Sequence, residues 1–248
     1  MKQRLPLILF ALGFFLISLV LTMPASQAYK WGLYPEEIQL YGLKGRVLDG
    51  KASQVSINDI SVNNVSWSWR PLSLLAGKLS FNWFVNDSEL KGKGSAGLSL
   101  LGCYELSNAT LTFNAHKFAH LFPKGNALSG SINLELDSLI YENEVERVAS
   151  TAKTELLTLE TLAGEFQISP LDITIQGDEK GVIDIRLVDM KDSNGLSLLI
   201  NMEGKDIKLS GNIHSQNFVA KQASSVLPLI ANKKGNNWVV SWKGILPL

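Results

Sequence analysis

Beyond residue 24, apolar and polar residues alternate along most of the chain with a period of two rather than 3.6. Strict alternation is typical of strands that bury one face and expose the other to water. The clearest alternating segments are Val65–Trp69, Leu79–Trp83, Leu111–Phe113, Ile132–Leu136, Phe166–Ile168, Leu171–Ile175, Ile183–Leu187, Leu198–Met202, Ile207–Leu209 and Trp238–Trp242. Short strands spaced about 8–12 residues apart predict an antiparallel all-β fold, either a curved sheet or a sandwich.

Glycine and Asx residues separate these strands, and Asn194-Gly195 is the strongest hairpin signal, because a type I′ turn needs two positive φ angles. Helical exceptions are few, and Thr151–Leu162 fits a helix or a strand. The expected short helices and turns are Leu72–Leu75 after Pro71, Lys117–Phe122 and Phe218–Ile230. The polar stretch Glu142–Thr154 is the weakest point of the pattern, but we expect residues 25–248 to form one β domain.

The first 24 residues have a different character. Lys2 and Arg4 precede an uncharged apolar run from Leu5 to Met23, and Pro24 ends it. At 1.5 Å per residue, a helix of this length reaches about 28 Å, close to the ~30 Å hydrocarbon core of a bilayer. Since the basic residues lie on the N-terminal flank only, residues 1–24 are predicted to be a cytoplasmic N-terminus and a single transmembrane anchor. Residues 25–248 are then exported.

A cleaved signal peptide is the alternative for this segment. Ser26-Gln27-Ala28 offers small residues at the spacing that a signal peptidase requires. The apolar run is longer than the 7–15 residues usual for a signal peptide, which favours a retained anchor. Both interpretations place the bulk of the chain outside the cytoplasm.

The charge balance and the cysteine content argue against several classes of protein. The chain has 248 residues, with 23 Lys+Arg against 23 Asp+Glu, which argues against a nucleic-acid binder. Setting aside Lys2 and Arg4 leaves 21 basic and 23 acidic residues, so the exported part is mildly acidic. The single cysteine, Cys103, excludes a disulfide framework and argues against a cysteine-based metal site. We expect its side chain to be buried in the core.

No motif for catalysis emerges from the sequence. His116 and His120 are four residues apart, as two metal ligands on a helix would be, but no glutamate follows His116 in an H-E-x-x-H pattern. Two polar residues on a surface turn explain them better. A G-x-S-x-G nucleophile motif is absent from the sequence. The sequence therefore predicts a protein that is not an enzyme, with no catalytic, cofactor or metal site.

The most informative cluster is aromatic. Trp67 and Trp69 share one face of a strand, and Trp83 on the next strand could pair with them across a hairpin. Both a buried aromatic core and an exposed patch for a partner or a lipid fit this pattern. The residues that we expect to act in packing or in contact with a partner are Trp67, Trp69, Pro71, Leu74, Leu75, Gly77 and Trp83.

Three segments after the apolar span carry recognisable motifs. They are Leu40–Ala52, with the pattern L-x-G-L-x-G-x-x-x-x-G-x-A, Val65–Leu79, with W-x-x-x-P-L-x-L-L-x-G, and the strand Leu128–Leu134, with G-x-(apolar)-x-L. In these ordered motifs the chain resembles the type II secretion system protein N family, also called general secretion pathway protein N. Leu48 stands where that family often has Trp.

This resemblance implies a non-catalytic accessory or assembly protein of the type II secretion machinery. Such a protein would sit in the bacterial inner membrane with a periplasmic β domain. Its partners would be inner-membrane platform subunits and the outer-membrane secretin, reached through sheet edges or aromatic patches. The P-L-x-L-L-x-G segment also looks like parts of AsmA-type envelope proteins. The alternative is therefore a lipid-binding or lipid-handling protein with an apolar β groove.

Overall fold

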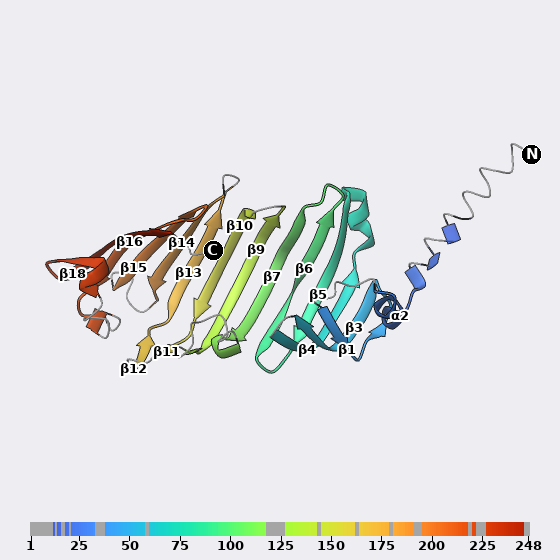
Figure 1. Cartoon of the computed structure of the whole chain (residues 1–248), viewed down its shortest axis with the longest axis horizontal. Coiled ribbons are helices and arrows are strands. Elements are labelled where there is room, and N and C mark those ends of the chain that lie inside the picture. Colours follow the sequence, from blue (N-terminus) through green and yellow to red (C-terminus); the bar gives the residue numbers. More distant parts are fainter. Residues whose placement is uncertain are drawn as a thin grey trace, which may run out of the picture. The chain divides into compact units, whose positions relative to one another are not determined.

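The structure is a computed structural model that falls into two compact units, Met1–Ser88 and Glu89–Leu248, here called the N-terminal and C-terminal units. Each unit is all-β, as the alternation predicts, with few helices (Figure 1). The described residues are 12, 14–15, 18–19, 21–32, 38–57, 60–117, 127–142, 145–161, 164–178, 181–190, 195–217, 220–221 and 227–245.

The N-terminal unit is an antiparallel sheet with strand order β1-β3-β4-β5, in which β2 also pairs with β3. Successive strands are joined by hairpins, so the register carries side chains that are distant in sequence into rows across the sheet. Its elements are α2 (Ala25–Lys30), β1 (Ile38–Tyr41), β2 (Lys44–Gly45), β3 (Asp49–Ile57), β4 (Ile60–Trp69), η1 (Pro71–Ala76) and β5 (Lys78–Asn86).

Helix α2 covers the outer edge of β1 and β2. The backbone N–H of Leu40 donates to the Tyr29 hydroxyl at 3.5 Å, and that of Val47 donates to the Met23 carbonyl at 3.0 Å. Pro24 also forms an isolated bridge with Arg46, and Ala25 and Ala28 of the helix are fully buried. The segment around α2 thus engages two backbone N–H groups, those of Leu40 in β1 and of Val47 after β2.

Along β4, the alternation between half-buried and exposed residues shifts by one position at Asn63-Asn64. Val62 and Val65 are both half-buried, while the two asparagines between them are exposed. Asn64 has a φ of +52°, a left-handed conformation that asparagine tolerates better than most residues. Asn108 in the C-terminal unit, at +49°, is the other non-glycine residue with positive φ in the described part of the chain.

The C-terminal unit has a main antiparallel sheet of order β6-β7-β9-β10-β13-β14-β15-β16-β18-β17 and a three-stranded sheet of order β12-β11-β8. Its larger strands are β6 (Leu90–Ser99), β7 (Tyr104–Asn114), β9 (Ser131–Tyr141), β10 (Val145–Thr154), β13 (Leu171–Gly177), β14 (Val182–Asp189), β15 (Leu196–Glu203), β16 (Asp206–His214) and β18 (Asn237–Ile245). The shorter elements are β8 (Ala127–Ser129), β11 (Leu157–Thr161), β12 (Gly164–Ile168), α4 (Leu227–Ile230) and β17 (Ala231–Lys234).

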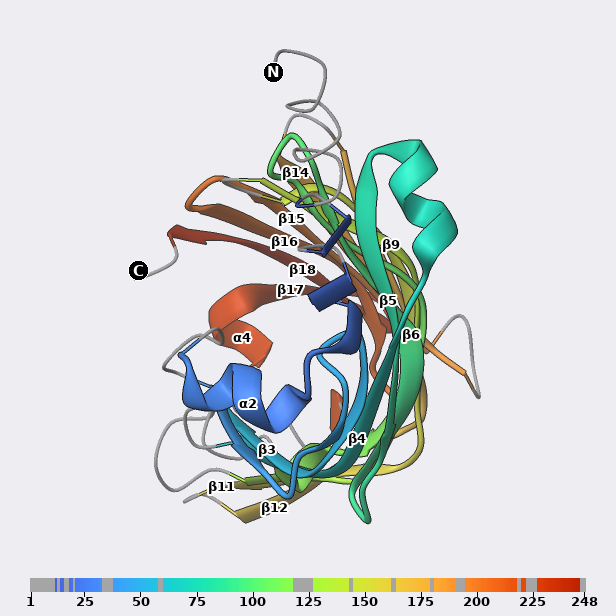
Figure 2. The same cartoon turned by 90° about the vertical axis from the view of Figure 1, so that its right-hand side faces the viewer.

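The core of the C-terminal unit lies where α4 covers the β17–β18 hairpin (Figure 2). The buried residues of this core are Leu171, Leu196, Ile213, Ala220, Leu227, Ala231 and Val240. The carboxylate of Asp189 is also buried in this unit, and it accepts hydrogen bonds from Ser169 Oγ at 2.8 Å and Asn217 Nδ2 at 2.9 Å. Neutral donors therefore compensate the burial of this charged group.

The alternating segments identified in the sequence all lie in strands, which confirms the all-β prediction. Thr151–Leu162, which fitted either state, contributes to β10 and β11. The polar stretch Glu142–Thr154 is not a boundary: β10 pairs with β9 on one side and with β13 on the other. The contacts divide the chain after Ser88 instead.

Several of the predicted features fall wholly or partly outside the described residues. They are Asn194 of the predicted hairpin, most of Lys117–Phe122, most of the apolar run Leu5–Met23 and much of Phe218–Ile230. Of Phe218–Ile230, α4 forms the C-terminal end. No helix in the described part of the chain is both long enough and apolar enough to span a bilayer.

Candidate functional site

Trp67 lies directly opposite Trp83 across the β4–β5 hairpin, a pairing that the sequence allowed, and Trp69 lies opposite Phe81. The Trp67 indole donates through Nε1 to the Val47 carbonyl at 2.8 Å. Its ring covers Gly50, where an added Cβ would come within 2.6 Å of Trp67 Cζ2. The glycine therefore makes room for the ring, and Trp67 ties β4 to the loop between β2 and β3.

The other two tryptophans are held by packing alone. The Nε1 atoms of Trp69 and Trp83 are buried, and neither has a hydrogen-bond partner among the described residues. A buried donor without a partner costs about 1–3 kcal/mol, which the contact area of a large aromatic ring can offset. All three rings are half-buried. They lie between the two alternatives left open by the sequence, a buried core and an exposed patch.

The 3₁₀ helix η1 joins β4 to β5 and forms the end of this hairpin (Figures 1 and 2). Arg70 and Ser80 close the hairpin through a backbone hydrogen bond of 2.9 Å. The Ser73 hydroxyl donates to the Arg70 carbonyl at 2.6 Å and accepts from the Ser80 backbone N–H at 3.2 Å. Pro71 occupies the start of η1, where its missing N–H costs little.

Gly77 ends η1 in the left-handed conformation, with a φ of +69°, and its N–H donates to the Leu74 carbonyl at 3.0 Å. Glycine adopts this conformation without the penalty that a side chain would bring. The hydrogen bonds at both ends of η1 therefore fix it on the hairpin.

The leucine side chains of η1 face solvent. Leu72 is 78% exposed, Leu74 49% and Leu75 88%. Full burial of one such side chain is worth about 1.5–3 kcal/mol, so three of them on a fixed short helix are available to stabilise a contact. We call Leu72, Leu74 and Leu75 the leucine knob. The sequence singled out Leu74 and Leu75 but not Leu72, which the exposed fraction reveals.

A second pair of exposed leucines lies in the C-terminal unit, at the β6–β7 turn. Leu100 is 80% exposed and Leu101 86% exposed. The turn is closed by hydrogen bonds from the N–H of Ser99 to the Cys103 carbonyl at 2.8 Å and from the N–H of Gly102 to the Ser99 carbonyl at 3.0 Å.

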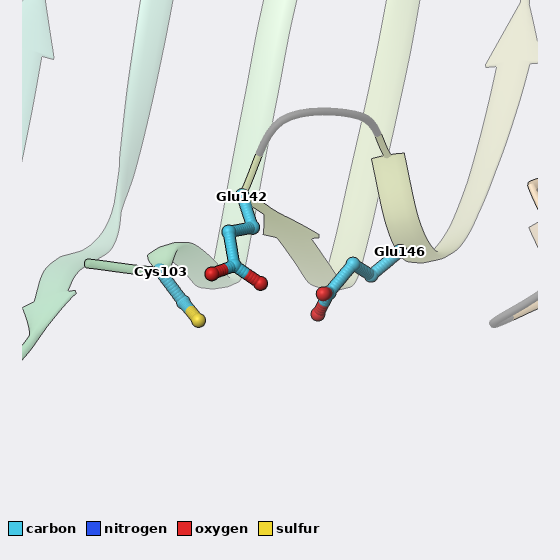
Figure 3. Close-up of side chains that lie close together, drawn as sticks. All are labelled: Cys103, Glu142 and Glu146. Carbon is cyan, nitrogen blue, oxygen red and sulfur yellow. The ribbon is translucent and has the colours of Figure 1, made fainter. Parts of the chain in front are cut away.

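Cys103 is half-buried rather than buried in the core, because it directly follows this exposed turn. Its thiol lies near the carboxylates of Glu142 and Glu146, and Figure 3 shows the three side chains together at the ends of neighbouring strands. Their potential ligand atoms lie within 4.8 Å of one another, the only such trio in the part of the chain that the structure describes.

The histidines do not gather in the described part of the chain. The backbone N–H of His116 donates to Asn114 Oδ1 at 3.0 Å, and His120 lies outside the described residues. His214 accepts from the Gln216 N–H through Nδ1 at 3.3 Å.

Most of the chain matches a known protein family. The profile described as "Type II secretion system (T2SS), protein N" matches residues 36–240. A similar protein is the type II secretion system protein N of Vibrio cholerae serotype O1 (strain ATCC 39315 / El Tor Inaba N16961), 31% identical over 90 residues. This alignment spans 35% of this chain and only 36% of the relative. No solved structure matches the chain.

Proposed function

Because this chain belongs to the type II secretion system protein N family, we propose that it is a non-catalytic assembly component of the secretion machinery. The family match extends over most of both units and favours this function over the handling of lipids. The lack of recognisable nucleophile and metal-ligand motifs in the sequence supports a role in contact rather than in chemistry.

The proposal places residues 1–24 as a cytoplasmic N-terminus and inner-membrane anchor, and residues 25–248 in the periplasm. The support comes from the apolar run Leu5–Met23 and from the two basic residues, Lys2 and Arg4, on its N-terminal flank only. In this arrangement the β units meet the periplasmic parts of other subunits, including platform proteins and the secretin.

The leucine knob is the proposed contact with another subunit, and its exposure is the observation that carries the proposal. Leu72 and Leu75 are each more than three-quarters exposed on a helix that hydrogen bonds hold in place. A fixed apolar projection loses little conformational entropy on binding. The partner surface would be an apolar groove on a periplasmic part of the inner-membrane platform.

The experiment replaces Leu72 and Leu75 with serine in the full chain and measures the fraction of a secreted substrate retained in the periplasm. We expect retention with normal abundance of the variant. Leu100 and Leu101 provide a matched control, since their exposed fractions of 80% and 86% are close to the 78% and 88% of the test pair. Serine at this second pair should leave secretion intact.

A photo-crosslinking residue in place of Leu75 identifies the partner directly. We expect a crosslinked product with a platform subunit, and none from the same residue in place of the exposed Ser61 on β4. Normal secretion by the Leu72/Leu75 variant, or equal loss from both leucine pairs, would contradict the knob as the contact site.

A further inference from the structure

A hollow of about 530 Å³ lies on the exposed face of the N-terminal sheet. The strand register explains its walls. Lys44 of β2 pairs with Lys51 of β3, Lys51 pairs with Ser66 of β4, and Ser66 pairs with Phe84 of β5. Four side chains from four strands therefore form one row across the sheet. All four line the hollow.

The depth of the hollow comes from the irregularity beside this row. Gly42 and Asn64, both with positive φ, also line it, together with Ser53 and Asn86. Gly42 contributes no side chain and packs against the Ser53 side chain. Asn64 Nδ2 donates to the Asn86 carbonyl at 3.3 Å, so these two lining residues are joined to each other.

The two lysines form a like-charge pair across β2 and β3. Like charges directly opposite on neighbouring strands destabilise a sheet. No ion pair is formed by Lys44 or Lys51 with any residue in the described ranges. The Asp49 carboxylate accepts from the Trp69 backbone N–H at 3.2 Å and forms no ion pair with either lysine.

A second pair of opposed lysines, in the C-terminal unit, has a carboxylate beside it. Lys208 of β16 lies directly opposite Lys243 of β18. There Glu203 lies 3.8 Å from the Lys208 ammonium and supplies a negative charge. The pair at the hollow has the same cross-strand geometry without that carboxylate.

The remaining lining residues suit a peptide ligand. The hydroxyls of Ser53 and Ser66 form no hydrogen bond within the described part of the chain, so they are available to a ligand. Phe84 is 51% exposed and offers one apolar wall. No arginine lines the hollow, although arginine is the residue that best matches the geometry of phosphate. Its volume also falls in the range of sites that hold several ligand groups rather than one small ion.

We infer that this hollow binds an acidic peptide segment of a partner protein, with carboxylates at Lys44 and Lys51 and an apolar side chain against Phe84. The inference goes beyond the proposed function and uses a different surface from the leucine knob. An attractive charge would replace the repulsion between the two lysines. Binding should therefore be salt-dependent.

The test measures fluorescence anisotropy of a labelled peptide in which glutamate alternates with threonine and leucine, titrated with the full chain in detergent micelles. Replacing both lysines, Lys44→Gln with Lys51→Gln, should weaken binding about tenfold or more, a change expected when charge pairs at an interface are lost. The matched control, Lys208→Gln with Lys243→Gln, should bind like the unmodified chain. All four substitutions are at exposed positions, so both variants should fold normally. Circular dichroism verifies their folding.

Two results would overturn the inference. One is unchanged peptide affinity in the Lys44/Lys51 variant. The other is displacement of the peptide by inorganic phosphate at concentrations where acetate has no effect, which would identify a phosphate site instead. A normal crosslink from Leu75 in the Lys44/Lys51 variant would show that the leucine knob functions independently, so the two proposals can fail separately.

Discussion

Asp87 accepts two hydrogen bonds from Asn63, one from its backbone N–H at 2.9 Å and one from its side-chain Nδ2 at 2.7 Å. The carboxylate is buried, with only 3% of Asp87 exposed. The pair ties the end of β5 to β4 at the point where the inward face of β4 changes its phase. It therefore stabilises the irregularity that shapes the neighbouring hollow.

Replacing Asp87 with alanine should lower the free energy of unfolding by about 2–3 kcal/mol, because it leaves the Asn63 backbone N–H without its acceptor in a partly buried position. Urea denaturation followed by circular dichroism measures this change. Asp172→Ala, at a half-buried position on β13, is the control and should have a smaller effect. Equal effects would show that the Asn63 contacts contribute little.

The left-handed backbone of Asn64 gives a second prediction. Alanine at this position should destabilise the chain by about 1–2 kcal/mol, because a Cβ opposes positive φ and alanine lacks the polar side chain that compensates. Asn64→Gly should cost much less, since glycine adopts this conformation freely. Thermal unfolding of the two variants tests the difference, and an alanine variant as stable as the glycine variant would contradict it.

Two tryptophans of the β4–β5 hairpin should respond differently to phenylalanine. Trp67→Phe removes the hydrogen bond to the Val47 carbonyl, whereas Trp83→Phe removes a buried N–H that has no partner within the described residues. We expect Trp67→Phe to be more destabilising by about 1 kcal/mol. Chemical denaturation of both variants measures this ordering, and the reverse order would show that ring volume outweighs hydrogen bonding.

Gly50 should not accept a larger residue. In Gly50→Ala the new methyl group would lie 2.6 Å from Trp67 Cζ2 and 2.8 Å from the Arg46 carbonyl oxygen. Such overpacking typically costs about 1–3 kcal/mol. Combining Gly50→Ala with Trp67→Leu should recover part of that loss, because the ring is the movable half of the clash. A double-mutant cycle without coupling would contradict the assigned contact.

The sequence was sufficient to predict the strands, because these depend on local alternation. It allowed a Trp67–Trp83 pair, but only the register of β4 and β5 establishes that pairing. The phase change at Asn63-Asn64 was not predicted, since a left-handed asparagine leaves no mark on the hydrophobic pattern beyond two adjacent polar residues. The hydrophobic pattern also could not show that the tryptophans of the hairpin are half-buried while the leucines of η1 are exposed. That difference depends on how the end of the hairpin packs.

The hollow on the N-terminal sheet could not be predicted from the sequence for a different reason. Its central row comes from four separate strands, and only the register brings together Lys44, Lys51, Ser66 and Phe84. The position of Cys103 likewise depends on an exposed turn that composition does not reveal. Predictions that need long-range register or solvent exposure require the folded structure.

Helix α2 has a consequence for the behaviour of the protein at high concentration. Uncovered sheet edges allow identical molecules to join strand to strand and grow into insoluble fibres. By engaging Leu40 and Val47, the segment around α2 removes one starting point for such growth. The segment Met23–Lys30 thus reduces strand-to-strand association of identical molecules at these two positions.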